Sequence, residues 1–401
     1  MRRLLKIILR WLPTVLRPLV AVLFLLITSF DPSPVKKTIA AAPSGCPHAG
    51  FCFLGAELVN FLPPAGLAGT IQTTNTGTFR SDYASYSLQS SCNWIGGGCG
   101  AQTSTTTTLP PTEALSTPVF DPQSDIWIHF WMSAGQITTF MNVALLSISD
   151  TGGTPRVAVV GTGNNNQAAI VTQATSGTLT RLATCSLPAS LEVLNQYDIH
   201  LHYATAGNVV LYQNSTSVCS FSGDTTGGSG LTAVSQVSFM GTLNNDSGWF
   251  FWSEMAVASV DTRSLTVWDP VVQSASATQT WTGTVSDIRP PNPGDAAFIY
   301  SSAANQPSLW IFADAIPAGT WSIPVIMEQV RSLVGTTGPL NIGYAVQPAG
   351  ASSPAVTASF HPTTTFSSAA PYWWTANPYT SAPWAPSDIS SSLLFGVESL
   401  P

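Results

Sequence analysis

The chain has 401 residues, enough for two ordinary domains, and only 8% of them are charged. All three lysines lie at or before residue 37, so few residues suit the exposed faces of long helices, which argues against a mainly helical protein. From residue 38 onward there are six arginines and 19 acids, a net charge of −13 that would repel phosphate backbones. Nucleic acid is therefore not expected as a partner.

Residues 1–45 form a basic, apolar segment whose uncharged run is Pro18–Phe30 (PLVAVLFLLITSF). A membrane-spanning helix needs about 20 such residues, more than this run supplies. A signal peptide, with small residues at Ala40–Ala42 for cleavage, therefore fits better than a membrane anchor. A hydrophobic arm that docks into an assembly and a misassigned start are the remaining alternatives. The membrane is expected as a partner only through this segment, if it stays uncleaved.

Residues 46–262 alternate short β-type segments with turn signals. Asp125–Met132 (DIWIHFWM) is aromatic and β-branched, which is typical of a core strand. Gln196–Ala204 alternates, so Tyr197, Ile199, Leu201 and Tyr203 should share one face, and Asp198, His200 and His202 the other. Further strands follow at intervals, the last at Trp249–Ala258, without a helical period between them. The pattern predicts an all-β sandwich or jelly roll.

Residues 263–401 restart the β pattern as a second, smaller domain. Strands are expected at Thr278–Val285, Ala297–Tyr300, Leu309–Ala313, Thr320–Val334 and Leu340–Val346, with a helical turn at Glu328–Arg331. From His361 the chain is rich in proline and aromatic residues. Because proline fixes φ and donates no hydrogen bond, this tail is predicted to be an extended arm. A short apolar segment, Ile389–Ser399, should dock at its end.

Six cysteines form three local pairs in the sequence: Cys46 with Cys52, Cys92 with Cys99, and Cys185 with Cys219. The short spacings suit disulfide-closed loops in an oxidising compartment, although six cysteines allow fifteen pairings. Buried free thiols are the alternative.

Several stretches resemble known proteins. Asn75–Gln89 (NTGTFRSDYASYSLQ), the strand at Asp125, Tyr197–Asn214 and Trp249–Ala258 resemble the concanavalin A-like, laminin-G-like jelly roll. The stretches WSEMAVASVDTRSL, TWTGTVSDI and APWAPSDISSSLLFGVES resemble structural proteins of tailed bacteriophages. That resemblance implies a concanavalin A-like jelly-roll β-sandwich, then a smaller β-sandwich domain and a tryptophan-containing C-terminal segment. The basic, apolar N-terminus and the cysteine pairs depart from that family's pattern.

Catalytic residues are hard to find in this sequence. A glycosidase of this fold needs two carboxylates, and Glu254 has only Trp252 and Ala256 as neighbours on its predicted strand face. Glu254 is therefore interpreted as a structural acceptor, with Arg263 as its partner. No Gly-x-Ser-x-Gly elbow occurs. His200 and His202 could bind a divalent metal, but a solvent-facing pair is favoured.

Binding residues are the remaining candidates. No cofactor is expected, although the oxygen-rich turns Asn164–Asn166, Asp224 and Asn244–Asp246 could bind Ca²⁺; Asx turns are the preferred interpretation. Trp373, Trp374 and Trp384 could stack on glycans or anchor a subunit interface.

Two functions compete on this evidence. The first is a non-enzymatic structural component of a phage or phage-like particle (head decoration, tail or fibre). Its partners would be other copies of itself and other particle proteins, and it could contact host-surface glycans. The second is a secreted or surface-attached lectin-like protein that binds carbohydrate. A glycosidase is the weakest hypothesis, so the chain is predicted not to be an enzyme. Its predicted location is accordingly the virion, or the secreted or cell-surface fraction.

Overall fold

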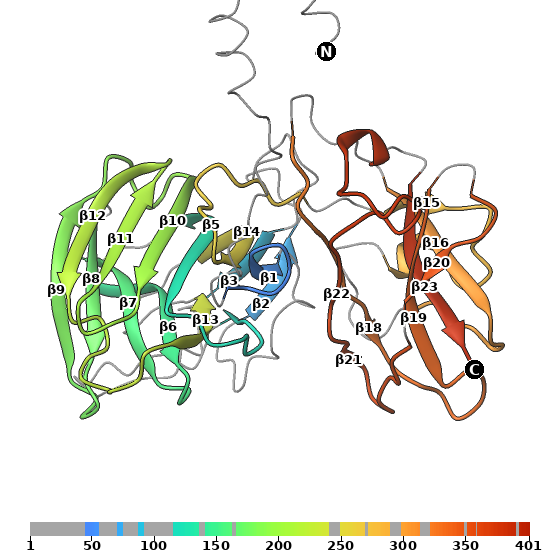
Figure 1. Ribbon diagram of the computed structural model, residues 1–401, viewed down its shortest axis with the longest axis horizontal. Coiled ribbons are helices and arrows are strands. Elements are labelled where there is room, and N and C mark those ends of the chain that lie inside the picture. The colour runs from blue at the N-terminus through green and yellow to red at the C-terminus, as the bar shows by residue number, and fades with distance from the viewer. Residues whose placement is uncertain are drawn as a thin grey trace, which may run out of the picture. The chain divides into compact units, whose positions relative to one another are not determined.

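The computed structural model describes residues 45–55, 70–74, 87–91, 115–135, 141–162, 166–239, 249–268, 272–288, 298–312, 321–348, 351–357, 359–389 and 393–401 (Figure 1). The chain divides into two units, Met1–Ser44 and Gly45–Pro401, and all of these residues belong to the second. The predicted N-terminal segment therefore lies outside the described residues. In the described part of the chain, no helix has the length and hydropathy needed to cross a bilayer.

The larger sheet of the first β region has eight antiparallel strands. In spatial order they are β12 (Thr216–Gly223), β11 (Gly207–Gln213), β10 (Asn195–His202), β5 (Asp125–Gly135), β14 (Trp249–Ala258), β3 (Ser87–Ser91) and β2 (Thr70–Thr74), with β1 (Phe51–Gly55) paired to β14. Figure 1 shows β12, β11, β10 and β5 lying side by side in this order.

The second sheet has six strands. Their order is β4 (Leu115–Ser116), β13 (Val234–Phe239), β6 (Met141–Asp150), β7 (Pro155–Thr162), β8 (Gln167–Gln173) and β9 (Leu179–Ser186). A tight turn at Asp150 joins β6 to β7, and the Asp150 carboxylate accepts hydrogen bonds from the amides of Gly152 and Thr154. Asp150 also accepts from Arg156 Nε at 2.7 Å, so these two buried charges are paired.

The core of the jelly roll lies between these two sheets. Strands β10 and β5 direct every second side chain into it, including Tyr197, Ile199, Ile128 and Phe130, all of them fully buried. They meet residues such as Ile148 and Val159 from the six-stranded sheet. Burial of each such side chain contributes about 1.5–3 kcal/mol, so the alternating pattern stabilises a two-layer sandwich. The predicted all-β jelly-roll sandwich is confirmed.

The C-terminal region is also built from strands, and they are shorter. A five-stranded sheet has the order β15 (Val272–Ala275), β16 (Gln306–Phe312), β23 (Leu394–Leu400), β19 (Asn341–Gln347) and β20 (Ala355–Val356). Two ribbons accompany it: β17 (Ile326–Glu328) with β22 (Tyr372–Trp374), and β18 (Arg331–Ser332) with β21 (Ser367–Ser368). An aromatic cluster that includes Tyr344, Trp374 and Trp384 packs between β19, β23 and the β17–β22 ribbon.

Three local expectations in this region are wrong. Thr278–Val285 is not a strand: it holds turns and the start of the 3₁₀ turn η2 (Val285–Asp287). In the segment Ala297–Tyr300, the described residues 298–300 contribute only an isolated bridge between Tyr300 and Thr282. Instead of a helical turn, Glu328 ends β17 and Arg331 begins β18. The many Pro and Gly residues shorten the strands here, because neither supports a long ladder.

The tail from His361, predicted to be an extended arm, is instead a packed part of this region, whereas the predicted docking of Ile389–Ser399 as a final strand is confirmed by β23. Its residues supply β21, β22, the 3₁₀ turn η3 (Pro386–Asp388) and the sheet strand β23. Strand β23 pairs with both β16 and β19, so it is a central strand of the sheet.

Candidate functional site

The side of the eight-stranded sheet that faces away from the core gathers polar and aromatic side chains. We call the part of it formed by β12, β11, β10 and β5 the outer face. Strand registers place its side chains in adjacent rows across the sheet. The first row is Ser222, Asn208, His202 and Asp125; the second is Ser220, Val210, His200 and Trp127; the third is Ser217, Tyr212, Asp198 and His129.

Asp125 and two histidines form the polar centre of the first two rows. Asp125 Oδ1 lies 3.0 Å from His200 Nε2, and Asp125 Oδ2 lies 3.3 Å from His202 Nδ1. The side chains of Asp125 and His202 are 50% and 43% exposed, and that of His200 is 23% exposed. The predicted solvent-facing histidine pair is therefore confirmed, and a carboxylate from the next strand joins it.

Aromatic rings border this polar centre. The Trp127 ring stacks on His200, with centroids 4.4 Å apart, and lies 5.6 Å from the Tyr212 ring. The guanidinium of Arg263 lies over both rings, 5.4 Å from the Trp127 centroid and 4.9 Å from the Tyr212 centroid, which are cation–π contacts. Arg263 comes from the segment that follows β14, so that this segment reaches the outer face.

Buried hydrogen bonds anchor the same segment to the third row. Asp198 Oδ1 accepts from Thr262 Oγ1 at 2.8 Å and lies 2.8 Å from His129 Nδ1, while Asp198 Oδ2 accepts from Gln196 Nε2 at 2.7 Å. Asp198, His129 and Thr262 are essentially buried. Gln196 also donates to the Arg263 carbonyl at 2.9 Å. The segment Asp261–Arg263 therefore covers Asp198 and His129 of the third row and lies over Trp127 of the second. The polar centre of Asp125, His200 and His202 remains accessible.

Asp261 and Arg263 form a closed ion pair at this boundary. Arg263 Nε lies 3.0 and 3.1 Å from the two Asp261 carboxylate oxygens, and Arg263 Nη2 lies 2.6 Å from Asp261 Oδ2. These hydrogen bonds hold the pKa of Asp261 below its usual value, so that this carboxylate stays ionised.

Sequence reasoning found only part of this site. The alternation in β10 placed Asp198, His200 and His202 on one face, and the same alternation in DIWIHFWM would have placed Asp125, Trp127 and His129 together. The segment Asp261–Arg263 had no such signal, because the contacts that fix it come from residues about 50 to 65 positions away.

Glu254 does not occupy the face that was predicted for it. The register of β14 against β5 shifts between Ser253 and Ala256, and Glu254 has a φ of 52°, which marks a bulge. The bulge turns Met255 toward the core. Glu254 Oε2 accepts a hydrogen bond from the Val267 amide, so its interpretation as a structural acceptor is confirmed. The expected partner is wrong, because Arg263 pairs with Asp261. A bulge gives no signal in a simple alternating pattern.

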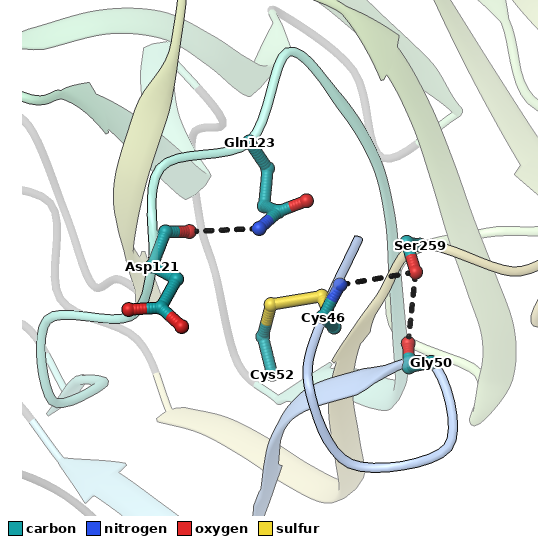
Figure 2. Close-up of a disulfide and its surroundings, with 6 residues drawn as sticks. All are labelled: Cys46, Gly50, Cys52, Asp121, Gln123 and Ser259. Atoms are coloured by element: carbon teal, nitrogen blue, oxygen red, sulfur yellow. Dashed lines mark hydrogen bonds between the residues drawn. A yellow bond between two sulfur atoms is a disulfide. The ribbon is translucent and has the colours of Figure 1, made fainter. Parts of the chain in front are cut away.

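Two of the three predicted disulfides lie among the described residues and are formed. Cys46–Cys52 closes a six-residue separation, and Figure 2 shows its loop held to Ser259, which accepts from the Cys46 amide at 3.2 Å and donates to the Gly50 carbonyl. Cys185–Cys219 joins β9 of the six-stranded sheet to β12 of the eight-stranded sheet. Cys92 and Cys99 lie outside the described residues.

The candidate Ca²⁺ turns are described in part. Asp224 Oδ1 accepts from the amide and the hydroxyl of Thr226, at 2.8 and 2.6 Å, which is an Asx turn. Asn164, Asn165 and Asn244–Asp246 lie outside the described residues, while the Asn166 carbonyl accepts from the Leu187 amide. Among the residues that the structure describes, no group of three or more His, Cys, Asp or Glu could hold a metal ion.

The C-terminal aromatic residues are mostly structural. Trp374 and Trp384 are 6% and 4% exposed, and Trp384 Nε1 donates to the Trp374 carbonyl at 2.9 Å. Their predicted role in stacking on glycans or anchoring a subunit interface is therefore corrected, because both rings belong to the aromatic core. Trp373 is half-buried, and its ring stacks on His48 with centroids 4.5 Å apart.

No known family model matches the chain, and no curated protein matches it either. Several solved structures are similar to it. "Cellulose induced protein, Cip1" is 14% identical, with 52% of this chain and 90% of that chain covered at a TM-score of 0.36. An endo-β-1,4-glucuronan lyase from the fungus Trichoderma reesei is 11% identical, with 53% and 94% covered at 0.36. The family 7 alginate lyase A1-II′ is 14% identical, with 43% and 78% covered at 0.31.

One expectation from the sequence is corrected by these comparisons, and another stays open. The prediction that the chain is not an enzyme is corrected, because two of these similar structures are polysaccharide lyases. The resemblance to phage structural proteins stays a prediction.

Proposed function

We propose that this protein is a secreted or surface-attached protein that binds carbohydrate through the outer face. The observation that carries the proposal is the accessible polar centre of Asp125, His200 and His202 in the first two rows, with the Trp127 and Tyr212 rings beside it. A sheet that presents such side chains on several neighbouring strands suits a long ligand better than a small one.

The chemistry of the first two rows supports this function. Sugar hydroxyls both donate and accept hydrogen bonds, so a sugar-binding surface needs both kinds of group. Asp125 accepts, while His202, Asn208, Ser220 and Ser222 supply donors and acceptors on neighbouring strands. Asn208 is partly exposed in the first row, beside His202 and Ser222.

The disulfides support the location. Cys46–Cys52 and Cys185–Cys219 are both formed in the fold. Disulfides persist in secreted and surface proteins and are rare in the reducing cytosol.

A binding titration with matched variants tests the proposal. Wild-type protein is titrated against a panel of soluble polysaccharides by calorimetry, together with an Asp125→Ala/Asn208→Ala double variant. The control is Arg181→Ala, an exposed residue of β9 on the other sheet. Loss of two hydrogen bonds of about 1 kcal/mol each should weaken binding on the order of tenfold or more, while the control binds as wild type does. Binding that the double variant retains in full, or a panel without any ligand, would overturn the proposal.

A further inference from the structure

The charged groups of the outer face are nearly all committed to one another. Its described residues include three carboxylates, Asp125, Asp198 and Asp261, and one guanidinium, Arg263. We propose that this face selects neutral sugars and discriminates against uronates and other anionic sugars. The inference rests on the proposed function and adds the class of ligand.

Arg263 is the one permanent cation that these described residues bring to the face, and it is already engaged. Its Nε and Nη2 atoms bond the Asp261 carboxylate at 2.6–3.1 Å. Its guanidinium carbon also lies within 5.4 Å of the Trp127 and Tyr212 ring centroids. A sugar carboxylate is recognised best by a bidentate arginine, and here Asp261 holds the place that such a carboxylate would take.

The imidazoles do not replace that cation. His200 and His202 both turn a ring nitrogen toward Asp125, and His129 Nδ1 lies against Asp198. A proton on any of these rings would therefore be balanced first by a carboxylate of the protein. Among the described residues, the outer face offers the ligand imidazole and carboxylate groups in contact, and its one guanidinium is already paired.

The Asp125 carboxylate gives the accessible part of the outer face a negative charge. This carboxylate is half exposed beside His202, so a sugar hydroxyl can donate to it, whereas a sugar carboxylate would meet a like charge. The neighbouring polar groups Asn208, Ser220 and Ser222 are neutral. The net charge of −13 beyond residue 37 acts in the same direction over longer range.

Matched pairs of polysaccharides that differ only at C6 test this inference. The pairs are β-1,4-glucan with β-1,4-glucuronan, and β-1,4-mannan with β-1,4-mannuronan, as soluble oligosaccharides titrated at about pH 8, where an ordinary imidazole is neutral. Wild-type protein should bind the neutral member of a pair at least tenfold more tightly. Asp261→Asn, which frees the Arg263 guanidinium, should narrow that ratio. Glu192→Gln removes one negative charge from an exposed position outside the face and should leave the ratio unchanged.

Each outcome separates this inference from the proposed function. If no oligosaccharide binds and the wider panel is also empty, the proposed function fails. If the uronate binds as tightly as its neutral counterpart, and Asp125→Ala/Asn208→Ala weakens both, the binding site stands and the selectivity is overturned. If Asp261→Asn and Glu192→Gln change the ratio of neutral to uronate affinity equally, net charge alone sets the selectivity. That result would overturn the role given to the Arg263–Asp261 pair.

Discussion

The two sheets of the jelly roll present opposite surfaces away from their common core. On the eight-stranded sheet, the outer face carries Asp125, Trp127, His200 and His202. On the six-stranded sheet, the corresponding side of β7 and β8 carries Ala158, Val160, Ala169 and Val171, all buried. One sheet thus uses its second surface for packing, and the other leaves titratable and aromatic groups accessible.

This difference indicates which of the two sheet surfaces can recognise a ligand. Alanine and valine offer no polar atom to a ligand, so the β7–β8 surface can contribute stability but little recognition. The outer face has the opposite composition. Its Asp125, His200 and His202 side chains contact one another and remain partly exposed, so they can contribute to recognition. Substitutions on the two surfaces should therefore separate stability from binding.

The largest effect is expected at Asp198, in the buried row of the outer face. Asp198→Ala would leave His129, Thr262 and Gln196 without their common acceptor. Breaking a buried, hydrogen-bonded charge costs about 3–5 kcal/mol, so the free energy of unfolding in urea should fall by that amount. The half-exposed Asp125 is the matched control, and Asp125→Ala should cost about 1 kcal/mol or less. Equal losses would show that the two rows do not differ in burial as described.

The disulfide that joins the two sheets should come next. Loss of Cys185–Cys219 in a Cys185→Ala/Cys219→Ala variant releases a loop with a sequence separation of 34, against 6 for Cys46–Cys52. Chain entropy alone gives about 4 kcal/mol for the longer loop and about 2 kcal/mol for the shorter. Urea unfolding of the two double variants measures both values. A larger loss at Cys46–Cys52 would contradict the expected order.

A matched valine pair tests the packing difference directly. Val160 on β7 is 3% exposed, whereas Val210 on β11 is partly exposed in the second row of the outer face. Val160→Ala removes buried methyl groups and should cost about 1–2 kcal/mol, and Val210→Ala should cost less than half of that. Thermal and urea unfolding provide the measurement. Val210→Ala should also alter carbohydrate binding more than Val160→Ala does, and the reverse result would count against the outer face.

The smallest expected effect is a change in pH dependence in the C-terminal region. Burial raises the pKa of Glu328 well above its usual value, although Trp374 Nε1 donates to its carboxylate at 3.1 Å. Above the ordinary glutamate pKa the unfolded chain loses this proton and the folded chain keeps it, so stability falls as pH rises toward the raised pKa. Glu328→Gln should remove that decline in urea unfolding followed from pH 4 to pH 8.

Asp287 supplies the control of opposite sign. Hydrogen bonds from Thr284 hold the pKa of Asp287 below its usual value, so its contribution is present above the unfolded pKa and disappears as pH falls through the folded one. The Asp287→Asn substitution should therefore lower the free energy of unfolding more at neutral pH than at acid pH. If Glu328→Gln and Asp287→Asn change the pH dependence of the unfolding free energy in the same direction, the opposite pKa shifts given to the two carboxyls are contradicted.

The sequence predicted the structural features that depend on residues close together in the chain. Alternation along β10 is a local property, so it gave both the buried tyrosines and the exposed histidines correctly. It failed at Glu254, where one bulge changes which residues face the core. It also failed in the tail, where Trp384 is buried by strands that lie far away in the chain. The site required the segment Asp261–Arg263, whose position is set by contacts across the sheet.

A crystal structure of the protein with the tightest-binding oligosaccharide from the panel tests the central claim most directly. The expected result is a sugar chain on the outer face, with hydroxyls within hydrogen-bond distance of Asp125, His202 and Asn208. A sugar bound only against the β7–β8 surface or in the C-terminal region would contradict the assignment of carbohydrate binding to the outer face.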